Sequence, residues 1–335
     1  MSSGTDDLLS QALTSLNIAG TGLDGYTFIE VTGTTQATVW KGTSPDDNKP
    51  ALALRLTPKP FELLRRIGAL INNVREVECP RTLHLAQLTT EGRTWTVQVC
   101  TWIGVGAPRK PEMRVLGQHL ARLHRCMAAS SLDFTDRTLS FERHSRPPSD
   151  QPLPAWYVAR DIWRDRIHAW QSLQPHQVAT QPIHGDLHWG NIVATQDGGF
   201  GFIDFDKVMF APPVFDLAKL IVTGMFRAAD RIQFQTRKTL ELLEGYESIR
   251  ALSDTEILAL EGLAVLLNEE IARLGEVYDV PAYREHADAV ASWWIARRYR
   301  SPSDPLGIRA SRHPTSRPAD QRSTQDVLWR DEQGL

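Results

Sequence analysis

The chain has 335 residues, which is long for a single hydrophobic core and favours two lobes. Its composition, 41% hydrophobic and 23% charged, is that of an ordinary globular enzyme, and the net charge of −3 indicates neither nucleic acid nor a membrane surface as a partner. Three scattered cysteines, no signal-peptide pattern and no apolar run of the roughly 18 residues that span a bilayer lead us to expect a cytoplasmic protein with free thiols.

The first hundred residues carry mainly strand patterns. The expected elements, in chain order, are a helix at 6–16, strands at 26–31, 37–41 and 51–56, a helix at 60–74, and strands at 83–88 and 95–100. Residues 1–103 are therefore predicted to form a β-rich N-terminal lobe that binds a nucleotide.

Helical patterns follow the segment Gly104-Val105-Gly106, which is the expected connection between the lobes. Helices are predicted at 111–127, 156–173, 213–227, 231–246, 253–275 and 281–299. Residues 104–300 then form a mainly helical C-terminal lobe. Residues 301–335, rich in Pro, Ser and Arg, are expected to be an extended wrap or a mobile tail. The fold class is α+β and bilobal.

The most informative segment runs His184-Gly185-Asp186-Leu187-His188-Trp189-Gly190-Asn191. Asp186 precedes Asn191 by five residues, and Asp204 follows thirteen residues later at the end of a β-type run. A hairpin predicted over 192–203 would hold Asn191 and Asp204 close together. Protein kinases use this arrangement, with an Asp beside the attacking hydroxyl, an Asn on one magnesium ion and a second Asp on the metals.

This segment resembles the catalytic loop of the aminoglycoside phosphotransferase and choline kinase family, small-molecule kinases with a protein-kinase-like fold. The resemblance implies that Asp186 accepts or orients the proton of the attacking hydroxyl, and that Asn191 and Asp204 bind Mg²⁺ through the hard oxygen ligands that this ion prefers. A chance set of turn and capping residues is the weaker alternative, because the spacing, the neighbours and the hairpin agree. Trp189 stands where the family often has Pro.

Four further residues are expected to support the catalytic loop. His184 would brace it by hydrogen bonding, as would His188, for which a contact with phosphate or substrate is the alternative. Asp206 is expected on the same side of a strand as Asp204, either in a structural hydrogen bond or near a second metal. Asp216 is expected to support the loop or to begin a helix.

On the nucleotide side, Arg55 stands in a β-run where kinases carry a phosphate-binding Lys, and related small-molecule kinases often use Arg there. An Arg holds phosphates through a bidentate fork. Its acidic partner is expected to be Glu62 on the following helix, with Glu76 as the second choice.

The remaining nucleotide contacts are expected from a turn and a hinge. The turn at 32–36 would cover the phosphates with backbone N–H groups and hydroxyls. The segment 98–102 would be the hinge that offers backbone groups to the adenine. The residues assigned to these contacts are Gly33, Thr34, Thr35, Gln98 and Cys100.

For the acceptor, Glu269 and Glu270 are expected to meet a cationic substrate, as acidic clusters do in the family; a solvated helix face is the alternative. Nearby Asp279 and Glu285 could add charge, and Trp293 and Trp294 could stack on a ring.

The sequence as a whole predicts an O-phosphotransferase that uses ATP (GTP is left open) and Mg²⁺ on a small-molecule hydroxyl, most simply an aminoglycoside or other antibiotic. A kinase of an amino alcohol or sugar and a nucleotide-binding pseudokinase are the alternatives. A protein kinase is disfavoured because no Ala-Pro-Glu segment follows Asp204. The oligomeric state stays open.

Overall fold

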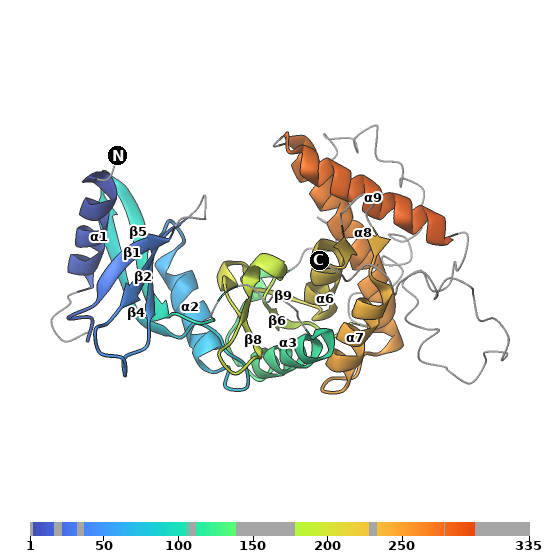
Figure 1. Ribbon diagram of the computed structural model, residues 1–335, viewed down its shortest axis with the longest axis horizontal. Helices are drawn as coiled ribbons and strands as arrows, with labels where there is room; N and C mark the ends of the chain where they lie inside the picture. Colours follow the sequence, from blue (N-terminus) through green and yellow to red (C-terminus); the bar gives the residue numbers. More distant parts are fainter. Residues whose placement is uncertain are drawn as a thin grey trace, which may run out of the picture.

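The structure, a computed structural model, describes residues 3–16, 22–31, 37–104, 106, 112–138, 178–227, 233–277 and 279–298. Its N-terminal part is a five-stranded antiparallel sheet in the order β1-β2-β3-β5-β4, accompanied by two helices (Figure 1). The elements are α1 (Ser3–Ser15), β1 (Thr27–Val31), β2 (Thr38–Thr43), β3 (Leu52–Thr57), α2 (Phe61–Asn72), β4 (Thr82–Thr90) and β5 (Arg93–Thr101).

The alternation of side chains along β3 separates the two faces of this sheet. Leu52, Leu54 and Leu56 are buried in one core with Ala12 and Leu16 at α1. Arg55 therefore points to the opposite face. The sequence places a cation on the sheet face that α1 does not cover.

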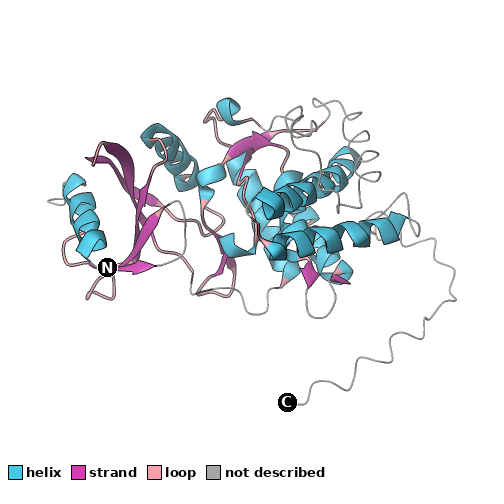
Figure 2. Cartoon of the chain, turned by 90° about the horizontal axis from the view of Figure 1, so that it is seen from above, coloured by secondary structure: helices cyan, strands magenta, loops and turns pink. Residues whose placement is uncertain are grey.

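The C-terminal part is mainly helical, with short paired strands between the helices (Figure 2). Its helices are α3 (Met113–Ala128), α6 (Val214–Gly224), α7 (Thr236–Glu247), α8 (Asp254–Val277) and α9 (Pro281–Arg298). Its strands pair as β6 (Gln181–Ile183) with β9 (Met209–Ala211), β7 (Ile192–Ala194) with β8 (Phe200–Phe202), and β10 (Phe226–Arg227) with β11 (Gln233–Phe234). The 3-10 helices are η1 (Thr135–Arg137), η3 (Trp189–Asn191) and η4 (Phe205–Lys207).

The connection after β5 lies on the β7–β8 hairpin. Gly104 has a φ of +79°, and a Cβ built there would lie 2.6 Å from the Val193 side chain. The carbonyl of Gly106 accepts a hydrogen bond from the N–H of Ala194 at 2.9 Å. Glycine is required at 104 because the backbone is left-handed and approaches a neighbouring strand closely.

The predicted α+β architecture is confirmed, and the strands of the sheet and most of the long helices lie where the sequence indicates. The helices predicted at 213–227 and 231–246 are shorter than expected, because Phe226–Arg227 and Gln233–Phe234 pair as the strands β10 and β11. The β6–β9 pair was not predicted. The predicted helix at 156–173, the turn at 32–36 with Gly33, Thr34 and Thr35, and the tail at 301–335 lie outside the described residues. No helix within the described ranges has the length and apolar character needed to cross a membrane.

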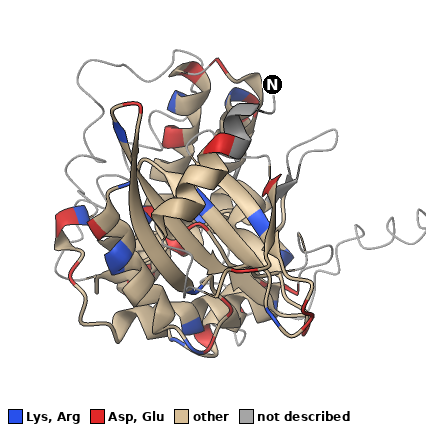
Figure 3. Ribbon diagram, turned by 90° about the vertical axis from the view of Figure 1, so that its left-hand side faces the viewer, with Lys and Arg blue, Asp and Glu red and all other residues tan. Residues whose placement is uncertain are grey.

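Acidic and basic positions are interspersed over the N-terminal end of the molecule (Figure 3), in keeping with the small net charge. Ion pairs join distant segments, including Arg66 with Asp136 at 2.8 Å and Arg125 with Glu76. Glu76, the second choice as partner of Arg55, is therefore engaged by another arginine.

Helices α3 and α7 cross at a pair of glycines. A Cβ at Gly117 would lie 2.0 Å from the carbonyl oxygen of Leu242, and one at Gly245 would lie 2.0 Å from that of Arg114. These contacts are with backbone, which cannot turn aside as a flexible side chain would. The crossing therefore depends on the absence of side chains at both positions.

We expect Gly117→Ala to lower the free energy of unfolding by about 2 kcal/mol, because the overpacking outweighs the better helix propensity of alanine. Urea denaturation followed by circular dichroism measures the change. Lys238→Ala, on an exposed position of α7, is the control and should lie within about 0.5 kcal/mol of the wild type. Equal stability of Gly117→Ala and wild type would contradict the close crossing.

Candidate active site

The loop that carries Asp186 begins directly after β6. Gly185 has a φ of +77°, and a Cβ there would lie 2.1 Å from the carbonyl oxygen of Lys207. Because β6 pairs with β9, the segment before β9 passes over the loop at this point. Only glycine fits, since both the backbone conformation and the close approach exclude a side chain.

The carboxylate of Asp216, on the first turn of α6, holds this loop in place. The backbone N–H groups of His184 and Gly185 donate to its two oxygens, each at 2.9 Å. The ring of His124, on α3, is 3.1 Å from one of the same oxygens. Asp216 and His124 are both fully buried. A single carboxylate thus joins the loop to two helices.

The hydrogen bonds around Asp216 specify the forms of two histidines. His124 donates from Nε2 to Asp216, so its Nδ1 accepts from the hydroxyl of Tyr246 at 2.8 Å. Burial lowers the pKa of His124, although the neighbouring Asp216 opposes the shift, and burial raises the pKa of Tyr246. His184 donates from Nε2 to the carbonyl of Ile203 at 2.9 Å, while its Nδ1 accepts from the N–H of Asp186. Each ring therefore donates through Nε2 and accepts through Nδ1 in this arrangement.

His188 acts on the same loop from its surface. Its Nδ1 accepts from the N–H of Gly190 at 3.1 Å and so caps the 3-10 helix η3. The neighbouring Trp189 packs on α6, where a Cβ at Gly224 would lie 1.5 Å from its indole nitrogen. Trp189 is thus accommodated because position 224 has no side chain.

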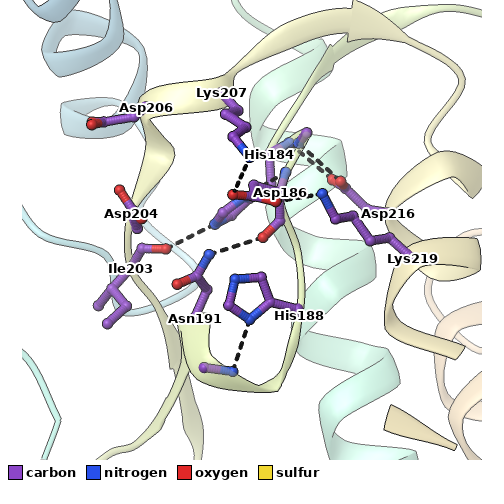
Figure 4. Close-up of polar contacts among 12 residues, drawn as sticks. His184, Asp186, His188, Asn191, Ile203, Asp204, Asp206, Lys207, Asp216 and Lys219 are labelled. Atoms are coloured by element: carbon purple, nitrogen blue, oxygen red, sulfur yellow. Dashed lines mark hydrogen bonds and ion pairs between the residues drawn. The ribbon is translucent and has the colours of Figure 1, made fainter. Parts of the chain in front are cut away.

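Asp186 lies at the centre of the site, between two lysines (Figure 4). Lys219 donates to one carboxylate oxygen, and Lys207 is 2.9 Å from the other. Burial of Asp186 opposes its charge, but the two lysines outweigh this effect and lower its pKa to about 2. Asp186 is therefore ionised at neutral pH.

Asn191 and Asp204 lie next to Asp186 through backbone contacts. The side-chain amide of Asn191 donates to the carbonyl of Asp186 at 2.9 Å, and the N–H of Ile203 donates to the carbonyl of Asn191 at 3.0 Å. Asp204 has a left-handed backbone, with φ +63°, two residues beyond the end of β8. Asp204 is the residue before the 3-10 helix η4 and Asp206 lies within it, so the expectation that they share one side of a strand is wrong.

The oxygen donors present suit a hard divalent cation. The amide nitrogen of Asn191 is hydrogen-bonded to Asp186, which leaves its amide oxygen available as a metal ligand. Asp204 adds a carboxylate, and its side chain is 40% exposed. Across the described ranges no cluster of three or more His, Cys, Asp or Glu is arranged to hold a metal. An ion here would need phosphate or water oxygens as well, which is how Mg²⁺ is commonly held.

Arg55 reaches this turn from the sheet. Its guanidinium forms a bidentate pair with Asp206 at 2.9 and 3.0 Å, and it contacts Asp204 at 3.4 Å. Burial and the nearby Asp206 raise the pKa of Asp204, which Arg55 opposes. The predicted Arg55–Glu62 pair is not formed, because Glu62 is on an exposed turn of α2 and binds Arg65 at 2.6 Å. Arg55 takes its acidic partner from the loop after β8.

The prediction that Gln98 and Cys100 belong to a hinge is wrong, because both are in the sheet. Gln98 and Cys100 lie within β5, where each is paired with β3 on one side and with β4 on the other. Their backbone groups belong to the sheet and are not offered to an adenine. Gln98 instead reaches Arg55 through its side chain, at 3.5 Å. The chain leaves the sheet only after Thr101.

The acidic pair expected at the acceptor site is divided. Glu269 is buried and binds Arg273, whereas Glu270 is exposed on α8. Trp293 packs on Phe234, with ring centroids 4.3 Å apart. Asp279 binds Arg284 at 2.9 Å. These contacts engage Glu269 and Trp293 in the fold of the helical lobe.

Sequence reasoning missed Lys207 and Lys219. Lys219 follows Asp216 by three residues on α6, so both side chains face the catalytic loop. That spacing was the available signal. Lys207 follows Asp206 directly, and nothing in its local sequence indicates that it reaches Asp186.

Comparison with known proteins agrees with this geometry. The family model described as the phosphotransferase enzyme family matches residues 30–252. The chain therefore belongs to this family of small-molecule kinases, and the suspected family relationship is confirmed. The homoserine kinase of Rhodospirillum rubrum is 28% identical over 218 residues, a match that covers 60% of this chain and 63% of that protein's length.

Solved structures share the protein-kinase-like fold. The amicoumacin kinase hAmiN, in complex with AMP-PNP, Ca²⁺ and Ami, has a TM-score of 0.61 and 14% identity, covering 86% of this chain and 96% of its own. A choline/ethanolamine kinase family protein from Mesorhizobium loti has a TM-score of 0.60 and 18% identity, covering 91% and 98%. A point mutant of an aminoglycoside 2'-phosphotransferase, in its GDP complex, has a TM-score of 0.62 and 14% identity, covering 89% of this chain and 99% of its own.

The lowered pKa of His124 predicts a pH dependence of stability. The folded state disfavours protonation of this ring, so the stability it contributes is complete above the unfolded pKa of about 6.5 and is lost as the pH falls. Between about pH 8 and pH 5.5, we expect the wild type to lose about 1 kcal/mol more unfolding free energy than His124→Gln. Urea denaturation at both pH values measures this difference. His84→Gln is the control, and a wild-type profile parallel to that of His124→Gln would contradict the prediction.

Proposed function

We propose that the chain transfers the terminal phosphate of magnesium ATP to the hydroxyl of a small metabolite, with Asp186 as the catalytic residue. The observation that carries this proposal is the hydrogen-bonded chain from Asp186 through Asn191 to Ile203, which brings the three motif residues Asp186, Asn191 and Asp204 to one place. The family assignment supports the same reaction class.

Asp186 would orient the acceptor more than it would remove its proton. An ionised carboxylate accepts a hydrogen bond from the acceptor hydroxyl and aims its oxygen at the terminal phosphorus. The acceptor oxygen forms a bond to phosphorus as the bond to the bridging oxygen breaks, and the hydroxyl proton passes to Asp186 or solvent. Little proton transfer is needed early, because the transition state of phosphoryl transfer is loose.

The nucleotide would be held on the side of Arg55 and Asp204. Bound magnesium ATP supplies the phosphoryl group and the charge neutralisation that its transfer requires. Asn191 and Asp204 would bind the ion, and Arg55 would contact phosphate oxygens. Two hydrogen bonds from Arg55 to the carboxylate of Asp206 orient the guanidinium before the nucleotide binds.

The acceptor is best sought among metabolites. The expected antibiotic acceptor rests on family resemblance and on structures whose low identity establishes only the fold. The homoserine kinase of R. rubrum is 28% identical over the matched residues, compared with 14% to 18% for the solved structures named above, and its name gives a hydroxy amino acid as the acceptor. This favours a metabolic role over resistance.

We expect Asp186→Asn to lower kcat for phosphate transfer by about a hundredfold or more while the Kd for magnesium ATP changes by less than about threefold. The substitution removes the charged acceptor of the hydroxyl hydrogen bond and leaves the nucleotide contacts in place. The kcat is measured by phosphate transfer from labelled ATP to a panel of hydroxy amino acids, amino alcohols, sugars and aminoglycosides. The Kd for magnesium ATP is measured by calorimetry.

Asp24→Asn is the matched control, because Asp24 is exposed in the N-terminal lobe and the same charge is removed. It should retain wild-type turnover. Turnover of Asp186→Asn equal to that of the control would refute the assignment of Asp186.

The nucleotide assignment predicts that Arg55→Lys raises the Kd for magnesium ATP about tenfold, since an ammonium cannot bridge Asp206 and phosphate as a planar fork does. Arg65→Lys, which changes an exposed pair with Glu62, is the control. Calorimetric titration compares the two. If Arg55→Lys bound the nucleotide as tightly as Arg65→Lys, Arg55 would have no role in nucleotide binding.

A further inference from the structure

Two lysines contact the carboxylate of Asp186. Their combined charge of +2 exceeds the single negative charge that they neutralise. Lys219 and Lys207 each bind one of its oxygens. In the described part of the chain, these are the only hydrogen bonds and ion pairs that either ammonium makes. Each ammonium has three donors, so donors remain to be satisfied at this point.

The two lysines differ in exposure. The side chain of Lys219 is 17% exposed, whereas that of Lys207 is 55% exposed. A largely desolvated ammonium is costly without nearby negative charge. Lys219 is therefore a fixed cation, while Lys207 can move from Asp186 to a ligand at little cost.

The position of Lys219 separates it from the proposed nucleotide side. In Figure 4, Asp204 and Asp206 lie to the left of Asp186, and Lys219 approaches from α6 on the right. The metal and phosphates belong with Asp204 and Arg55. The lysine on the other side is left to face the acceptor, whose hydroxyl must also reach Asp186.

We propose that Lys219 and Lys207 form an anion-binding site that takes a carboxylate of the acceptor, so that the substrate is a hydroxy acid or hydroxy amino acid. This inference rests on the proposed function and names its substrate class. The acceptor carboxylate displaces Lys207 from one oxygen of Asp186 and binds both ammonium groups. That oxygen of Asp186 is then free to accept the hydrogen bond of the acceptor hydroxyl. A polycationic acceptor meets two like charges here and is disfavoured.

The test uses acceptor pairs that differ only in charge: L-homoserine, L-threonine and glycerate, each with its carboxamide, together with choline and an aminoglycoside. With magnesium ATP, we expect the wild type to show a kcat/KM at least about tenfold higher for one carboxylate than for its carboxamide. Lys219→Gln and Lys207→Gln should each reduce this preference by raising the KM for the carboxylate, with the KM for ATP within about twofold of wild type. Lys238→Gln, at an exposed site, should match the wild type.

Two kinetic outcomes overturn the proposal while leaving the proposed function intact. One is a higher kcat/KM for choline, the aminoglycoside or the carboxamides than for every carboxylate. The other is an equal loss for carboxylate and carboxamide in the lysine variants, which would assign the lysines to the transferred phosphoryl group or to the placement of Asp186.

A binding measurement decides the matter without turnover. With magnesium AMP-PNP present, at least one carboxylate acceptor should raise the Tm of the wild type in a concentration-dependent manner and should not do so in Lys219→Gln. Lys207→Gln tests the same site with a residue exposed enough to leave folding unchanged. Absence of transfer to any acceptor would count against the proposed function, whereas absence of carboxylate-dependent stabilisation would overturn the anion site.

Discussion

The buried carboxylate of Asp216 is the interaction on which the active-site geometry depends. Its two oxygens take three donors, from His184, Gly185 and His124, in a region with no exposure to water. Hydrogen bonds to a carboxylate are stronger than those to a neutral oxygen. Asp216 is also in the first turn of α6, where the helix dipole favours a negative charge. Because Asp186 follows Gly185 directly, the backbone position of Asp186 depends on contacts with a residue of α6.

Much of the fold is predictable from the sequence because its elements are long and periodic. The helix at 281–299 and the strands around Arg55 follow from side-chain spacing alone. The β6–β9 pair was missed because three-residue strands have no detectable period and their partners are distant in the chain. The predicted strand end at Asp204 is instead a turn, since a positive φ at a non-glycine residue is imposed by tertiary contacts.

The site is predictable where its chemistry lies within one segment. The spacing of Asp186, Asn191 and Asp204 indicates all three. It does not indicate the partner of Arg55, because Asp206 lies 151 residues further along the chain and competes with a nearer glutamate that is solvated and already paired with Arg65. Lys219 was missed for a similar reason: its pairing with Asp186 depends on α6 packing beside the loop that carries Asp186.

The distribution of charge around Asp186 explains how three carboxylates can share one small site. On one side, Asp206 is paired with Arg55 and lies beside Arg137, so the partly exposed carboxylate of Asp204 is the group best placed for a divalent cation. At Asp186 itself, Lys207 from η4 and Lys219 from α6 exceed the single negative charge of the carboxylate, which suits an anion. Without the lysines, Asp186 would be a partly buried carboxylate near two others, and its pKa would rise as that of Asp204 does. The lysines thus favour the ionised form of Asp186, the residue proposed to be catalytic, and they place positive charge where the proposed acceptor carboxylate would bind.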